Sequence, residues 1–411
     1  MKKHLLILFV LIFPIIIIAQ DNKNFGIKFS GFVKSDIFWD SRQTVDVREG
    51  HFCLYPQNEK LDINGKDVNA KSKFNILSIQ TRLKGNITGP DAFGAKTSAY
   101  IEAEFFGTSN ANVNGFRLRH AFAKLTWTNT ELLVGQYWHP MFITGCYPGT
   151  VSFNTGAPFQ PFSRNPQIRL SQNFNNFKIQ LSALSQRDFT STGLDGPSSK
   201  YLRNSVLPEM NITLQYATKF DNGNELLTGV GGDYKMLTPR LETDSLYKTD
   251  EKVSGFSGMA FLKYKLQPIT LKFEGVYGQS TYSLTMLGGY VVHSITDINK
   301  YFVDYTTVNT LSFWADIHTN GKKIQGGLFA GYTKNLGAGE NVSGPYYSRG
   351  ANIAYVYRVS PRIIFNSGKM RFAGEVEYTV AAYGTTDVEG VVHNYKDIGN
   401  LRLLIGVYYF F

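Results

Sequence analysis

Apolar and polar residues alternate with a period of two along most of the chain. The alternation is regular between residues 178 and 186, and again between residues 209 and 216. A period of two places apolar side chains on one face of a β-strand and polar side chains on the other. No stretch of comparable length has the spacing of an amphipathic helix. The pattern therefore predicts an all-β protein whose strands have one apolar and one polar face.

Sixteen segments show this pattern, and most are longer than the strands of a soluble sheet. Their length suits tilted strands that cross a membrane. The predicted strands are 27–39, 73–86, 94–106, 115–128, 131–138, 166–174, 177–186, 208–219, 225–236, 255–265, 269–280, 307–318, 322–333, 350–366, 370–383 and 398–411.

The connections between these segments alternate between long and short. The first connection covers residues 41–72 and the fifth covers 139–165, whereas Asn129-Thr130 and Asn175-Asn176 are tight hairpin turns. Outer-membrane barrels have long loops at one end and short turns at the other. A soluble sandwich, the alternative, has no reason to sort its loops in this way. We therefore predict a transmembrane antiparallel up-and-down β-barrel of about 16 strands, closed because lipid cannot satisfy an open sheet edge.

Composition and the N-terminus agree with this class. The chain is 43% hydrophobic and 18% charged, with 31 Phe, 24 Tyr and 39 Gly, which excludes a disordered chain. Only one long apolar run is present, Leu5 to Ala19, so a polytopic helical membrane protein is excluded. Lys2 and Lys3 precede this run, which is typical of a signal peptide over residues 1–19. An uncleaved helical anchor is the alternative. Residues 20–411 are then one outer-membrane domain.

The fifth connection, 139–165, is the third long loop and differs in composition from the first. It contains one basic residue, Arg164, and no carboxylate, whereas residues 41–72 hold ten charged residues. A loop surrounded by water should resemble the first. Residues 139–165 carry aromatic side chains such as Tyr147 and Phe153. We expect this loop to fold into the barrel and narrow it; packing outside the barrel or over a neighbouring subunit is the alternative.

Charged residues occupy many of the polar positions that would face an aqueous lumen. Rings of fixed charge select ions by sign, so an excess of arginine favours anions, and guanidinium groups bind carboxylates through two hydrogen bonds. A ladder of structural ion pairs is the alternative for each arginine. The predicted lumen positions are Lys34, Asp36, Gln80, Arg82, Lys84, Glu102, Glu104, Arg117, Arg119, Arg169, Arg358, Arg362, Glu375, Glu377 and Arg402.

The sequence offers little support for catalysis or for a cofactor. The seven histidines show no metal-ligand spacing, and neither a nucleophile elbow nor a phosphate-binding glycine loop is found in the sequence. Basic residues form no stripe that would indicate nucleic-acid binding. Cys53 and Cys146 both fall in loops on the same side of the predicted barrel. An exported chain can oxidise them to a disulfide, and two unpaired thiols are the alternative.

Three short motifs resemble one family. Gly31 to Asp36, Arg117 to Phe122 and Leu133 to Trp138 are similar to segments of Gram-negative porins, most closely the DcaP-like porins, over roughly residues 26–174. The resemblance implies a sixteen-stranded trimeric channel for small, mainly anionic solutes. It also implies a basic eyelet at Arg82, Arg117, Arg119 and Arg169. The alternating last strand ends at Phe411, which resembles the signal that the barrel insertion machinery recognises.

These observations favour one function over two others. We predict an outer-membrane porin of a Gram-negative bacterium, not an enzyme, for small hydrophilic, anionic solutes. Its expected partners are outer-membrane lipid, the insertion machinery and two further copies of the chain in a homotrimer. A barrel that acts as an adhesin or receptor through its long external loops is the alternative. An outer-membrane hydrolase would need a Ser-His or Asp-His pair that the sequence does not suggest.

Overall fold

The fold was analysed in a computed structural model, which describes residues 25–411. The predicted signal peptide, 1–19, lies outside the described residues. Among residues 25–411, no helix has the length and apolar character needed to cross a bilayer.

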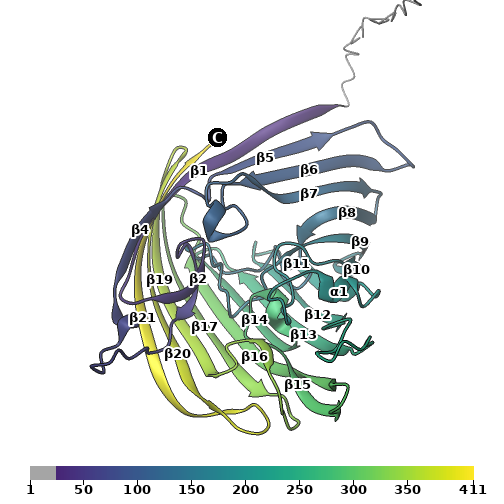
Figure 1. The fold of residues 1–411 in the computed structure, drawn as a ribbon. Coiled ribbons are helices and arrows are strands. Elements are labelled where there is room, and N and C mark those ends of the chain that lie inside the picture. The colour runs from purple at the N-terminus through teal and green to yellow at the C-terminus, as the bar shows by residue number, and fades with distance from the viewer. Residues whose placement is uncertain (1–24) are drawn as a thin grey trace, which may run out of the picture.

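The described chain forms a closed antiparallel barrel of 16 wall strands, as predicted (Figure 1). Strand β1 closes the barrel because it pairs with β21 on one side and with β4 and β5 on the other. The wall strands are β1 (Gly26–Asp40), β5 (Arg82–Thr88), β6 (Lys96–Glu104), β7 (Arg117–Thr126), β8 (Thr130–Trp138), β9 (Arg164–Phe174), β10 (Phe177–Leu184), β11 (Glu209–Lys219), β12 (Glu225–Leu237), β13 (Val253–Lys265), β14 (Ile269–Gln279), β16 (Phe302–Thr319), β17 (Ile324–Gly337), β19 (Ile353–Ser367), β20 (Met370–Thr386) and β21 (Val392–Phe410).

All sixteen predicted segments coincide with wall strands, with two kinds of difference. The second segment is interrupted, because β4 (Lys73–Leu77) precedes β5 and both pair with β1. Short elements also form within the long loops, where no membrane imposes alternation. They are β2 (Thr44–Val47), β3 (Phe52–Pro56), β15 (Gly288–Asp297), β18 (Tyr346–Arg349), the helix α1 (Lys200–Arg203) and the 3-10 turns η1 (Val68–Ala70), η2 (Asn110–Asn112) and η3 (Thr281–Leu284).

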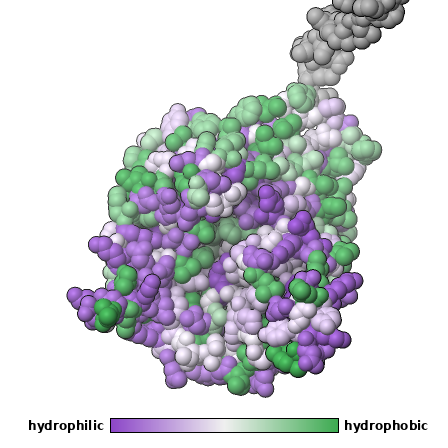
Figure 2. All heavy atoms as spheres, viewed as in Figure 1, coloured by the Kyte–Doolittle hydropathy of each residue, from purple (hydrophilic) through white to green (hydrophobic). Residues whose placement is uncertain are grey.

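The two faces of the wall have opposite character. On β11, the apolar side chains of Met210, Ile212 and Leu214 are exposed, whereas Asn211 and Thr213 are buried. A soluble protein would bury the apolar set. Apolar side chains that face outward and polar side chains that face inward are expected of a transmembrane barrel. In Figure 2, hydrophobic residues gather along the upper edge of the molecule, and hydrophilic residues cover most of the lower part.

We call the end of the barrel with the long connections the loop end, and the other end the turn end. Every wall connection at the turn end is short, such as 127–129, 175–176 and 368–369. Loop 1 (41–72) and loop 3 (139–163) belong to the loop end. This asymmetry matches the alternation of connection lengths in the sequence.

Candidate functional site: the charged lumen

Loop 3 contacts the inward-facing side chains of the wall at several points. The amide group of Asn154 donates to Glu377 Oε1 at 2.8 Å, and Ser312 Oγ donates to the Phe159 carbonyl at 2.8 Å. The amide of Val151 is hydrogen-bonded to Glu375. The side chain of Phe159 is fully buried and packs over Gly331, where an added Cβ would lie 2.5 Å from Phe159 Cγ.

Loop 1 also packs against the lumen wall, which corrects the expectation that it is surrounded by water. Phe52 to Pro56, the strand β3, is buried throughout. Arg358 of β19 donates to the Leu54 carbonyl at 2.7 Å, and Tyr383 of β20 donates to the Pro56 carbonyl at 2.8 Å. The ten charges of loop 1 misled the prediction because they flank an uncharged run, 52–58, that supplies the buried surface.

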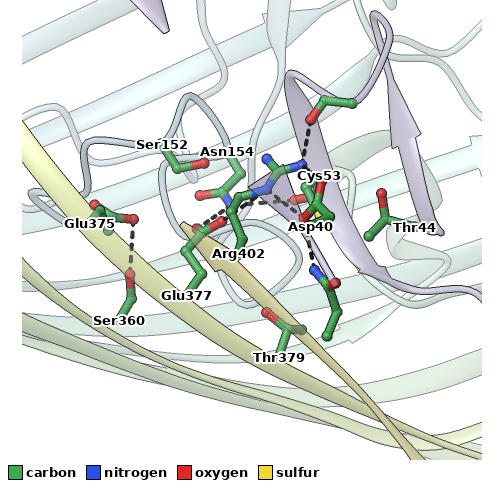
Figure 3. Close-up of polar contacts among 12 residues, drawn as sticks. Asp40, Thr44, Cys53, Ser152, Asn154, Ser360, Glu375, Glu377, Thr379 and Arg402 are labelled. Atoms are coloured by element: carbon green, nitrogen blue, oxygen red, sulfur yellow. Dashed lines mark hydrogen bonds and ion pairs between the residues drawn. The ribbon is translucent and has the colours of Figure 1, made fainter. Parts of the chain in front are cut away.

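Wall residues of the last strands hold both loops at once, as Figure 3 shows in part. Arg402 donates through Nε to Asp40 Oδ1 at 2.8 Å and through Nη2 to Asp40 Oδ2 at 2.7 Å. Its Nε lies 3.9 Å from Glu377 Oε2. Its Nη2 also donates to the Gly50 carbonyl of loop 1 at 2.8 Å. Arg358 donates to loop 1 and, through Nη1, to the Ala157 carbonyl of loop 3 at 2.9 Å. These arginines, two of the predicted lumen positions, therefore fasten the loops.

Lys34 has a similar role. Its ammonium group is fully buried, lies 2.9 Å from Asp36 Oδ1 and donates to the Val151 carbonyl of loop 3 at 3.0 Å. Lys34 therefore anchors loop 3 from the β1 side of the wall.

A charged layer lies beside loop 3, where β5, β6 and β7 face the lumen. Glu104 is its centre, because Arg117 Nη2 binds Glu104 Oε1 at 2.8 Å and Arg119 Nη1 binds Glu104 Oε2 at 2.6 Å. Arg119 also binds Glu102 at 2.5 Å. Arg82 lies 3.4 Å from Glu104. The strand register explains the cluster, since Arg82 and Arg117 are both cross-strand partners of Glu104.

Three of the four predicted eyelet arginines meet in this layer, and the fourth does not. Arg169 donates to Gln167 Oε1 at 2.9 Å and to the Trp138 carbonyl at 2.7 Å. It lines a separate cavity of about 160 Å³ with Lys124 and Lys178. The sequence could not show this separation, because alternation reports the face of a strand but not the distance around the barrel.

Loop residues that the sequence did not single out complete the layer. Arg164, where β9 begins, binds Asp188 at 2.9 Å, and Arg117 binds the other oxygen of Asp188 at 2.9 Å. Burial alone would raise the pKa of Asp188, but the two guanidinium groups outweigh burial and lower this pKa to about 2. Arg48 of loop 1 lies nearby, and burial together with Arg117 lowers the pKa of Arg48 to about 10.

Two cavities adjoin the charged layer. On the loop-end side, a cavity of about 590 Å³ is lined by Arg48, Arg117, Arg187 and Asp188. On the turn-end side, a cavity of about 460 Å³ is lined by Arg82, Glu102 and Arg119 together with loop 3. Tyr147 and Phe153, the predicted constriction residues, both line this second cavity. Phe153 also lies 5.8 Å from the Arg119 guanidinium, a distance suited to a cation–π contact.

A second cluster brings together residues that are far apart in the sequence. His139 Nε2 lies 3.2 Å from Glu209 Oε1 and 3.8 Å from Asp233 Oδ1, and all three are buried. These are ligand types of a cation site, but the ammonium of Lys235 lies 3.8 Å from Glu209 and supplies positive charge there. We interpret the cluster as a structural ion-pair network of β11 and β12. The sequence has no signal for it, because its members come from different strands.

Both cysteines of the chain are buried free thiols, the second of the two alternatives drawn from the sequence. Burial raises the pKa of Cys53 to about 11 and that of Cys146 to about 12.

Comparison with known proteins shows similarity of structure only. No protein-family model matches the chain, and no curated protein sequence matches it. The outer-membrane channel DcaP of Acinetobacter baumannii is 16% identical, with a TM-score of 0.67 over 95% of this chain and 98% of that chain. An anion-selective porin from Comamonas acidovorans is 12% identical, with a TM-score of 0.56 over 94% of this chain and 100% of that chain. Outer-membrane OmpT of Vibrio cholerae is 9% identical, with a TM-score of 0.53 over 94% of this chain and 98% of that chain. The structural similarity to DcaP agrees with the resemblance drawn from the sequence motifs, and the chain has the fold of Gram-negative outer-membrane porins.

Proposed function

We propose that this chain is an outer-membrane porin, a water-filled channel through which small hydrophilic, anionic solutes diffuse passively. The observation that carries the proposal is the charged layer with the two cavities that adjoin it. A solute that passes from the loop-end cavity to the turn-end cavity meets Arg117 first and then Arg119. Glu104 binds both of these arginines.

The balance of charge in this layer favours anions. Its basic side chains outnumber its carboxylates, so the potential remains positive after every ion pair is formed. A ring of fixed positive charge admits anions and repels cations. The basic members are Arg48, Arg82, Lys84, Arg117, Arg119 and Arg164, and the carboxylates are Glu102, Glu104 and Asp188.

Loop 3 is the constriction in this proposal. Its contacts with Glu377, Ser312 and Lys34 hold it against three separate parts of the wall. A loop fastened in this way reduces the open cross-section of a sixteen-stranded barrel, which is otherwise too wide for side chains to fill. Tyr147 and Phe153 then line the passage from loop 3, with Phe153 against the Arg119 guanidinium.

The packing of loops 1 and 3 favours a channel over an adhesin or receptor. An adhesin would display its long loops, but β3 of loop 1 is buried and Phe142, Phe153, Phe159 and Phe162 of loop 3 are also buried. We propose no catalytic activity.

We further propose that the protein assembles as a homotrimer in the outer membrane, after insertion through the signal at Phe411. A trimer form of Vibrio cholerae OmpT is among the similar structures, with a TM-score of 0.51. The exposed apolar positions of the wall, such as Ile212 and Leu403, would contact lipid or a neighbouring copy.

The test is ion selectivity in planar bilayers. Under a KCl gradient, the wild type should conduct in steps, and the sign of its reversal potential should show that chloride is preferred over potassium. Arg82→Gln and Arg117→Gln each remove one positive charge from the layer and should shift the reversal potential toward cations. Lys96→Gln is the matched control, because Lys96 is exposed near a turn and paired with Asp91. An unchanged reversal potential in both arginine variants would remove the charged layer from the selectivity filter.

A further inference from the structure

Two lysines face each other across strands β13 and β14 at the turn end of the lumen. Lys263 and Lys272 are direct partners in the antiparallel register. Side chains of such partners lie on the same face, with Cβ atoms about 4.5–5.5 Å apart, and like charges in this arrangement are destabilising. Both lysines line a cavity of about 380 Å³ beneath loop 3. The fold therefore maintains an unfavourable pair of charges inside a cavity.

The residues around this cavity relieve the repulsion only in part. The other basic residues that line the cavity are Arg362, Arg371 and His318, and no carboxylate lines it. Asp316, the cross-strand partner of Lys272 on β16, is shared with Arg362, which binds it at 2.8 and 3.0 Å. Lys272 Nζ donates to the Tyr147 carbonyl of loop 3 at 2.9 Å, a neutral partner. Among the described residues, neither Lys263 nor Lys272 forms an ion pair.

Other lysines near the lumen receive counter-charges from neighbouring strands. Lys265, two residues after Lys263, binds Glu225 Oε1 at 2.8 Å. Lys124 binds Glu131 at 3.1 Å. A structural ion-pair ladder accounts for these lysines. Around Lys263 and Lys272 the basic side chains outnumber the carboxylates, because Asp316 is shared with Arg362 and Glu225 is bound by Lys265. Arg362 and Arg371 line the same cavity, so positive charge remains in excess there.

We propose that Lys263 and Lys272 form a binding site for a phosphate oxyanion, either inorganic phosphate or a phosphomonoester. A phosphate dianion between two ammonium groups cancels their repulsion and accepts hydrogen bonds from both. Lysine binds phosphate as a compact point charge with several donors, whereas planar bidentate recognition of carboxylates uses arginine. Arg371 extends the positive surface of the cavity from the β20 side. Arg371 is positioned by Asn366 at 2.8 Å and has no acidic partner among the described residues.

The geometry of loop 3 and β17 supports an open, built cavity at this point. Gly149 and Gly327 both flank the Arg362 guanidinium, and an added Cβ would lie 2.6 Å from Arg362 Nη2 at Gly149 and 2.5 Å from its Cζ at Gly327. The two glycines therefore leave room for the Arg362 guanidinium, which binds Asp316 and lines the same cavity as Lys263 and Lys272. The site rests on the proposed channel function, because a solute reaches it only after passing the charged layer. It refines that function by identifying the solute as a phosphate.

Direct binding tests the proposal without relying on conductance. The folded barrel in detergent is titrated by calorimetry at pH 8 with inorganic phosphate, with glycerol 3-phosphate and with succinate. Removing one charge-assisted partner should weaken phosphate binding at least about tenfold in Lys263→Gln and in Lys272→Gln. Lys265→Gln, the matched control on the same strand, should bind phosphate as the wild type does.

Thermal unfolding gives a second signature in the same variants. Without phosphate, Lys263→Gln should unfold at a higher temperature than the wild type, because its repulsion with Lys272 is gone. Saturating phosphate should raise the midpoint of the wild type and of Lys265→Gln, but not that of a double variant that carries both Lys263→Gln and Lys272→Gln. A variant that misfolds would lower the midpoint in both conditions, so the single variants and the control separate misfolding from lost binding.

Each outcome of the titration decides something. Binding of glycerol 3-phosphate with the same lysine dependence supports an organic phosphate, and binding of inorganic phosphate alone supports the free ion. Equal, lysine-dependent binding of succinate overturns the assignment to phosphate. Phosphate binding that is unaffected in both lysine variants, or absent in the wild type, overturns the site. A barrel that conducts chloride without binding phosphate refutes this site alone, and one that binds phosphate without conducting refutes the channel alone.

Discussion

Arg402 and Asp40 join the last wall strand to the first through two parallel hydrogen bonds, 2.8 and 2.7 Å long, and both side chains are buried. The same guanidinium holds the Gly50 carbonyl of loop 1. One ion pair therefore helps close the barrel and dock a loop inside it. Similar double contacts by Arg358 show that the polar lumen wall is organised to hold loops as well as to face solutes.

Removing this buried pair should cost far more stability than removing an exposed one. Arg402→Ala leaves Asp40 buried without its partner, and such a loss costs about 3–5 kcal/mol. Lys396→Ala is the control, because Lys396 pairs with Glu59 on the exposed loop surface, where a pair contributes about 0–1 kcal/mol. Urea unfolding of the folded barrel in detergent measures both. Equal losses in the two variants would contradict the structural role given to Arg402.

Gly331→Ala should push loop 3 away from β17 and change the size of the passage. The new methyl group would lie 2.5 Å from Phe159 Cγ, and real Cβ contacts are never this close. Gly326→Ala, on the same strand β17, is the control because nothing lies within 4 Å of its added Cβ. Single-channel recording should show an altered or noisier conductance in Gly331→Ala only. A wild-type conductance in that variant would mean that the position of Phe159 does not set the size of the passage.

The two thiols should resist alkylation in the folded protein. Cys53 and Cys146 are buried, and their pKa values are raised to about 11 and about 12, so almost no thiolate forms at pH 8. Maleimide should label neither thiol in the folded barrel and both after denaturation in urea. Mass spectrometry without reductant distinguishes this result from a disulfide, which would leave both thiols unlabelled even after unfolding.

Asp188 should make the docking of loop 4 (185–208) dependent on pH. Its pKa is lowered to about 2, because the guanidinium groups of Arg164 and Arg117 outweigh its burial. A lowered pKa means that the ionised carboxylate stabilises the folded state above pH 4. This contribution is then lost progressively as the pH falls from about 4 to about 2. Pepsin should therefore cut loop 4 faster at pH 2 than at pH 4, when each rate is divided by the rate on an unfolded substrate at the same pH. Asp188→Asn, which cannot ionise, should show the faster cleavage at both pH values.

The sequence alone determined the wall of this protein. Alternation with a period of two identified all sixteen wall strands and the inward-facing positions, such as Arg119, Glu104 and Arg358, because the face of a strand depends only on residue order. The alternation of long and short connections determined the up-and-down topology for the same local reason. Opposite charges on adjacent strands form ion pairs in the charged layer, the structural ladder that the sequence left open as an alternative.

Only the tertiary structure decided what fills the barrel. Leu54 lies in a loop rich in charges, yet its carbonyl is bound by Arg358, more than three hundred positions further along the chain. Arg169 lies on the predicted face but apart from Arg119, and the lysines 263 and 272 become neighbours only through the register of β13 and β14. The contact between loop 1 and Arg358 exists only in the closed barrel, and the lysine pair depends on the register of one hairpin, which alternation along a single strand does not report.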